Sequence, residues 1–226
     1  MNRFYLSLLF ACLLTSCFAQ DYFEGEVHFK TTYQSLHPNL PEELLVQEFG
    51  DTLVGYVQEH RYIMQTNLKG STGQATMLML MDENLIYVIM EKSDTILRYP
   101  MDRVEEELLT IHKIQDDTKV ILGDECPSVM FNTKDPDPKS PFTLSIGKYY
   151  YNPKYKLNKQ SYANHYSGHW NAIINETGAI CVRNEVRREP LYTSVMEAFA
   201  IIPKEVPDEL FDVNSYNKVI VDLPAE

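Results

Sequence analysis

The pattern of apolar and polar positions is most regular between Gln74 and Met101. Three short apolar runs, QATMLMLM, LIYVIM and TILRYPM, are separated by the polar breaks at 82–84 and 92–94. Short runs that are rich in β-branched and aromatic residues and bounded by Asp, Asn and Ser are typical of consecutive antiparallel strands. The sequence therefore predicts a three-stranded centre for the fold.

The first two of these strands are apolar on both faces. Met77, Met79 and Met81 alternate with Leu78 and Leu80. In the next strand the two sets are Tyr87 and Ile89 on one side and Ile86, Val88 and Met90 on the other. A half-solvated sheet alternates apolar with polar residues, so both faces here need cover. We expect a short helix over 41–49 to cover one face, and further core or a ligand to cover the other.

The remaining pattern predicts further short strands. A strand is expected over 21–33, a long strand kinked at Gly55 over 52–66, a turn at 116–118, and a hairpin of 170–174 with 179–187 around Gly178. The segment 206–211 resembles a single helical turn, and 218–223 an edge strand. Three prolines within 135–141 exclude regular structure there. The sequence thus predicts one β-rich domain over residues 20–226.

The first nineteen residues have the composition of an export signal. Arg3 precedes an apolar run over 4–14, which is too short to span a membrane, and small residues follow. Cleavage after Ala19 would leave Gln20 first and a periplasmic or secreted protein. Alternatively, 14–17 resembles a lipobox that would lipidate Cys17. We favour the first alternative because the first strand begins near Tyr22, which leaves almost no tether to a lipid.

The charge excludes some partners. The chain has 20 Lys and Arg against 32 Asp and Glu, a formal net charge of −12. Nucleic acid requires a basic surface, and anionic lipid headgroups attract one as well. We therefore expect neither partner, and we expect no transmembrane span because no second apolar stretch is long enough.

Two cysteines, Cys126 and Cys181, follow the export signal. In an oxidising compartment such a pair predicts one disulfide. The alternative is two buried free thiols.

Two groups of residues are candidates for ligand binding. Methionine adapts to irregular apolar ligands, so one hypothesis is an acyl-chain site, against the alternative that these side chains only fill the core. Aromatic rings with a polar rim could instead contact a glycan or an envelope protein, unless the rings simply pack. The acyl-chain set is Met77, Met79, Met81, Tyr87 and Ile89, and the aromatic set is Tyr150, Tyr155, Tyr166 and Trp170.

No pattern of catalytic or metal-binding residues is present. His165 and His169 are four residues apart, but a metal would need a third ligand and a regular backbone to aim the two rings. The sequence contains no G-x-S-x-G, no H-E-x-x-H and no Gly-rich phosphate loop. We therefore expect a protein that is not an enzyme and binds no metal or cofactor.

Loose motifs run through most of the chain after residue 20. They are F-x-G-x-V at 23–27, the strand pair at 81–99, I-L-G-x-x-C at 121–126, the Tyr-rich strand at 148–151, the G-x-I strand at 178–182 and V-P-D-x-L-F at 206–211. Together they resemble the secreted GLPGLI-type and related uncharacterised envelope families, which are similar in fold to the lipoprotein carriers LolA and LolB. The Pro-Leu step usual before the late strand is replaced by Thr177-Gly178-Ala179-Ile180.

This resemblance implies a single antiparallel sheet curved into an incomplete barrel, with one or two short helices on its concave side. The function that it implies is binding of a hydrophobic ligand, a lipid or a lipidated chain, in the concave face. The alternative is a protein- or glycan-interaction module that uses the Tyr-rich segment 149–170. No catalytic residues come with these families.

Overall fold

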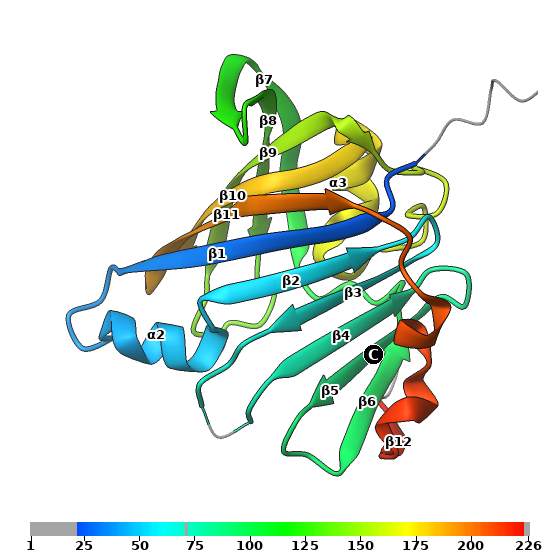
Figure 1. Ribbon diagram of the computed structural model, residues 1–226. Helices are drawn as coiled ribbons and strands as arrows, with labels where there is room; N and C mark the ends of the chain where they lie inside the picture. Colours follow the sequence, from blue (N-terminus) through cyan, green and yellow to red (C-terminus); the bar gives the residue numbers. More distant parts are fainter. Residues whose placement is uncertain (1–21, 71, 224–226) are drawn as a thin grey trace, which may run out of the picture.

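The computed structural model describes residues 22–70 and 72–223, and these form one sheet of twelve strands (Figure 1). Its order is β12-β6-β5-β4-β3-β2-β1-β11-β10-β9-β8-β7, and every neighbouring pair is antiparallel except β12 with β6. The strands are β1 (Gly25–Ser35), β2 (Thr52–Val57), β3 (Arg61–Thr66), β4 (Ala75–Leu80), β5 (Leu85–Met90), β6 (Thr95–Pro100), β7 (Glu107–Ile121), β8 (Asp124–Lys134), β9 (Leu144–Lys156), β10 (Ala179–Glu189), β11 (Tyr192–Pro203) and β12 (Val219–Asp222).

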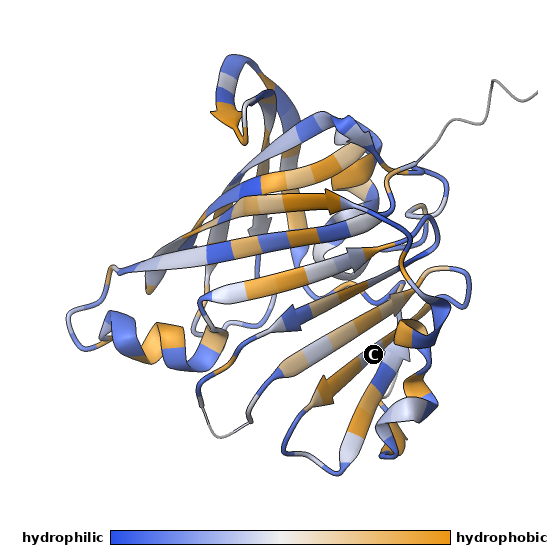
Figure 2. Cartoon of the chain, in the orientation of Figure 1, coloured by the Kyte–Doolittle hydropathy of each residue, from blue (hydrophilic) through white to orange (hydrophobic). Residues whose placement is uncertain are grey.

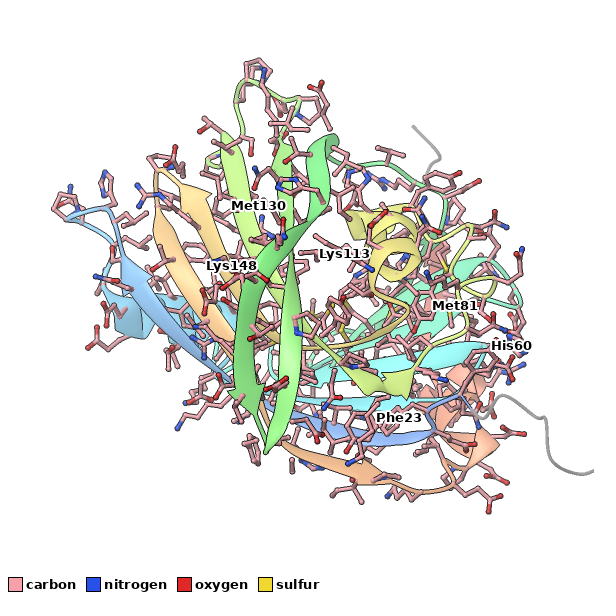
Figure 3. The ribbon with its side chains drawn as sticks, turned by 90° about the horizontal axis from the view of Figure 1, so that it is seen from above. Phe23, His60, Met81, Lys113, Met130 and Lys148 are labelled. Atoms are coloured by element: carbon pink, nitrogen blue, oxygen red, sulfur yellow. The ribbon has the colours of Figure 1, made fainter. Side chains whose placement is uncertain are left out.

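The sheet curves without closing, because β7 and β12 lie at its two ends and do not pair with each other. Helix α3 (Trp170–Thr177) and the preceding loop lie within the curve (Figures 1 and 3). The predicted fold class, a mainly β chain with one antiparallel sheet forming an incomplete barrel and short covering helices, is confirmed.

Two hydrophobic clusters are buried, one against each face of the sheet. The larger cluster fills the curve and joins α3, through Ile173 and Ile174, to inward-facing residues of most strands. The smaller cluster lies on the other face of β3–β6, where Val206 and Phe211 of the C-terminal segment pack against buried side chains such as Leu78. Strands β4 and β5 are apolar along most of their length in Figure 2. The prediction that both faces of these strands need cover is therefore correct.

The two covers differ from the predicted ones. Helix α2 (Glu42–Phe49) forms where the sequence predicts it, but it packs beside β1 and not on the central strands. The Tyr33 hydroxyl donates to the Gly50 carbonyl oxygen at 2.9 Å, and the ring of Phe49 lies against Tyr33 and Tyr192. Short 3-10 helices η2 (Asp208–Phe211) and η3 (Val213–Tyr216) supply the outer cover instead.

Three local predictions were wrong. Residues 170–177 form helix α3, because burying Ile173 and Ile174 together inside the curve suits a helical backbone; Gly178, at φ 62°, ends it. The segment 52–66 is a hairpin, β2 with β3, and not one long strand. Strand β7 continues through Asp116–Thr118 with an irregular register, and the chain turns at Leu122–Gly123.

The predicted disulfide is also absent, since Cys126 and Cys181 are free and buried. Cys126 lies on β8 and Cys181 on β10, with β9 hydrogen-bonded between them. Two strand spacings place the cysteine backbones about 9.6 Å apart, whereas bonded cysteines need Cα atoms within roughly 7 Å. The error came from assigning both cysteines to one sheet without knowing the order of its strands.

Candidate functional site

An apolar cavity of about 90 Å³ lies inside the curve of the sheet. Strands β1, β2, β3, β10 and β11 form one wall, and the opposite wall is formed by Leu157, Tyr162, Trp170 and Ile174. Among the described lining residues, the polar groups are the tyrosine hydroxyls, the indole N–H of Trp170, the Cys181 thiol and the amide of Asn184, and the rest of the lining is apolar. An engineered apolar cavity of about 150 Å³ binds benzene, so the cavity alone has room for only part of an apolar ligand.

A groove of about 240 Å³ lies next to this cavity, on the side of helix α2. The cavity and the groove share Leu53, Asn184 and Met196 as lining residues. We refer to the cavity and the groove together as the trough. Its groove end is lined by the aromatic rings of Tyr33, Phe49 and Tyr192, by hydroxyl side chains and by Arg188.

Strand alternation gives the trough an apolar end and a polar end. The inward positions of β1 read Val27, Phe29, Thr31 and Tyr33, from the cavity to the groove. On β11 the inward residues run from Met196 to Ser194 and Tyr192, and the antiparallel register places Met196 opposite Thr31. A ligand that is apolar at one end and polar at the other therefore matches the lining.

Gly55 helps to create the space. It lies opposite Val27 in the β1–β2 register and lines the cavity. A Cβ atom added there would approach nothing closer than the carbonyl oxygens of Val27 and Ile63, at 3.8 Å. The missing side chain thus leaves volume that a larger residue would fill. The sequence marks this glycine only as a possible kink, and the hairpin register shows its actual role.

The five residues of the predicted acyl-chain set do not line this space. Met77, Met79 and Met81 belong to the inner cluster, and Met79 is only 1% exposed (Met81 is labelled in Figure 3). Tyr87 and Ile89 lie on the opposite face, in the outer cluster. Grouping all five on one face was wrong, because Met77 pairs with Val88, and Tyr87 with Leu78, across β4 and β5.

The predicted aromatic surface is also divided. Tyr150 is 1% exposed, and the ring of Tyr155 packs edge-on against Phe23 with centroids 5.2 Å apart. Tyr166 is 41% exposed, whereas Trp170 lines the cavity. These four rings therefore form no common binding surface.

His165 and His169 have separate structural roles. The buried ring of His165 stacks on Tyr62 and Tyr162, and its Nε2 shares a 2.6 Å hydrogen bond with the Tyr62 hydroxyl. Burial lowers the pKa of His165 to about 4, so the ring is neutral at pH 7. Nε2 of His169 lies 2.8 Å from the Glu106 carbonyl oxygen. Across residues 22–70 and 72–223, no group of three or more His, Cys, Asp or Glu side chains is arranged to hold a metal ion.

Comparison with known proteins assigns no family. No family model matches the sequence, and no curated protein matches it. Among solved structures, PNGF-II is similar with a TM-score of 0.46 at 14% identity, over 88% of this chain and 31% of that chain. This chain therefore spans about a third of the length of PNGF-II.

Two further structures are similar over most of both chains. An uncharacterised conserved protein from Thermus thermophilus gives a TM-score of 0.42 at 8% identity, covering 87% of this chain and 90% of that one. A LolA superfamily protein from Nitrosomonas europaea gives 0.39 at 12% identity, covering 88% and 93%. All these TM-scores lie below 0.5, so they define no family for this chain, and the GLPGLI-type resemblance stays a prediction.

No helix in the described part of the chain has the length and apolarity to cross a membrane. The predicted export signal over residues 1–19, with cleavage before Gln20 or lipidation at Cys17, lies outside the described residues.

Proposed function

We propose that this protein binds a hydrophobic ligand, without catalysis, in the trough inside its curved sheet. The observation that carries the proposal is that the apolar cavity and the groove lie side by side within the curve and share Leu53, Asn184 and Met196 as lining residues. Pockets that bind small molecules are concave and mostly apolar, with a few polar groups that orient the ligand. The trough has this composition, and it takes the place of the predicted methionine site.

The proposal includes export to the periplasm or beyond, which the sequence of the first nineteen residues supports. A carrier in that compartment would meet lipids and lipidated chains. The acidic composition of the protein, with a net charge of −12, would keep it from associating with anionic membranes.

Filling the cavity at Gly55 tests the proposal. We expect Gly55→Leu to fold, because its Cβ meets only ordinary van der Waals contacts, and to weaken binding of the neutral fluorophore N-phenyl-1-naphthylamine at least tenfold. The matched control is Val54→Leu, whose side chain lies on the opposite face of the same strand. Fluorescence titration measures binding, and circular dichroism verifies the fold.

Two results would contradict the proposal. One is a wild-type protein that does not bind the fluorophore saturably. The other is a folded Gly55→Leu protein that binds it as tightly as the Val54→Leu control does.

A further inference from the structure

The charge of the trough is confined to one residue. Of the described residues whose side chains line the cavity or the groove, Arg188 alone is charged at neutral pH, and it lies at the groove end. This is a positive charge in a chain whose formal net charge is −12. An anionic group inside the trough would therefore be attracted to one place.

The guanidinium of Arg188 is held in place but has donors to spare. Nη1 of Arg188 lies 3.6 Å from Oε1 of Glu106, and Cζ of Arg188 lies 5.4 Å from the centre of the Phe142 ring. Within the described residues the side chain makes an ion pair and a ring contact, but donates no hydrogen bond. A guanidinium carries five N–H donors in a planar fork that matches a carboxylate.

Arg188 is in register with the rest of the trough. Asn184, Val186 and Arg188 alternate along β10 and line the groove, opposite Met196, Ser194 and Tyr192 of β11. Arg188 is therefore about 13 Å from Asn184 along the strand, at roughly 3.3 Å per residue. Beyond Asn184 lies the apolar cavity that ends at Trp170 and Ile174.

The capacity of the trough suits one chain. The cavity holds about 90 Å³ and the groove about 240 Å³. Small-molecule sites typically begin at about 300 Å³, so each space alone is too small, but the two volumes together are close to this limit. A lipid with two or three acyl chains would need more room than this.

We propose that the ligand is a single-chain aliphatic carboxylate, with its head group on the guanidinium of Arg188 and its chain directed past Asn184 toward Trp170. This inference rests on the proposed function and narrows its ligand class. A carboxylate can form an ion pair with the arginine fork and accept two parallel hydrogen bonds from it, whereas a neutral hydroxyl head group can accept a hydrogen bond but carries no opposite charge.

The test compares palmitate with hexadecanol, which has a chain of the same length and a neutral head group. Both are titrated below their aggregation limits into protein loaded with N-phenyl-1-naphthylamine. We expect wild type to bind palmitate at least tenfold more tightly than hexadecanol. We expect Arg188→Gln to remove this preference by weakening palmitate and leaving hexadecanol unchanged. Tenfold corresponds to about 1.4 kcal/mol.

Arg187→Gln is the matched control, because Arg187 lies on the opposite face of β10 and pairs with Glu189 at 2.9 Å. We expect it to bind palmitate as wild type does. Arg188→Lys keeps the charge but not the fork, and should recover part of the preference.

The outcomes separate this inference from the proposed function. Equal affinities of wild type for palmitate and hexadecanol, or equal losses of both in Arg188→Gln, would overturn the carboxylate and leave the apolar trough standing. Tighter binding of dipalmitoylphosphatidylglycerol than of palmitate would overturn the single-chain class. Failure of the fluorophore itself to bind would remove both proposals.

Discussion

Two single residues shape the trough, Gly55 by its lack of a side chain and Asn184 by its amide group. Gly55 leaves room in a wall where each neighbouring inward position of β2 is occupied by Leu53 or Val57. Asn184 brings an amide into the same wall, and within the described residues its buried Oδ1 has no hydrogen-bond partner. A buried polar group without a partner is costly, so the position favours a bound ligand or an ordered water.

His165 gives a prediction about pH. Its pKa is about 4 in the folded protein, against an ordinary value of 6.5. As the pH falls from 6.5 to 4, the His165 imidazole becomes protonated in the unfolded chain but stays neutral in the folded chain. Protonation therefore stabilises the unfolded state, and the free energy of unfolding decreases. The shift corresponds to roughly 3 kcal/mol. Between pH 7 and pH 4 the free energy of unfolding should fall in both proteins. We expect the fall to be smaller in His165→Gln than in wild type, by roughly 3 kcal/mol.

Urea denaturation at each pH measures this difference. His37→Gln is the control for the substitution itself, because His37 is exposed. A His165→Gln protein with the same pH dependence as wild type would show that the ring is not held neutral by burial.

The elements show why β4 and β5 can be apolar on both faces. The loop before α3 covers the inner face, where the backbone N–H of Ser167 donates to the Met101 carbonyl oxygen at 3.0 Å and Tyr162 stacks on Tyr62. The C-terminal segment covers the outer face and is fixed at its end by Lys218, whose Nζ donates to the carbonyl oxygens of Met90, Glu91 and Ser93.

Phe211 tests this outer cover. It is 3% exposed in the outer cluster, and truncating a buried phenylalanine typically costs about 3–5 kcal/mol. We expect Phe211→Ala to lower the free energy of unfolding in urea by at least about 3 kcal/mol. Leu210→Ala, at a position that is 39% exposed, should change it by less than about 1 kcal/mol. Similar losses for the two variants would show that the segment does not seal the outer face.

At the scale of the whole molecule, the order of the strands decides which residues meet. The strand between β8 and β10 separates Cys126 from Cys181, and the placement of β11 between β1 and β10 brings Met196 and Asn184 to Thr31 and Leu53. At the α2 end of the groove Phe49 is 42% exposed, so this end of the trough reaches the surface.

This arrangement predicts the chemistry of the two thiols. Burial raises the pKa of both, to about 12 for Cys181. We expect neither to react with iodoacetamide in the native protein at pH 8, because the thiolate is the reactive form. Both should be alkylated after denaturation without a reductant. Peptide mass mapping distinguishes this from a Cys126–Cys181 disulfide, which would leave both unmodified.

The sequence by itself determined the mainly β class, the helix at 41–49, the helical turn within 206–211, the edge strand within 218–223 and the need for cover on both faces of β4 and β5. These follow from patterns that are local in the chain, such as alternation, Pro and Gly positions, and apolar runs. Helix α3 was missed because its eight residues are too few for the helical period to outweigh the hairpin signal at Gly178.

The tertiary structure alone decided which faces became core, which became trough and which cysteines could pair. Met77 and Tyr87 both look apolar in the sequence, and only the register of β4 with β5 assigns them to opposite sides. No local pattern indicates that Gly55, Asn184 and Arg188 lie close together, yet the sheet brings all three to one space. The physical reason is that a cavity depends on side chains from strands distant in sequence, and its volume is set by what the surrounding residues fail to fill.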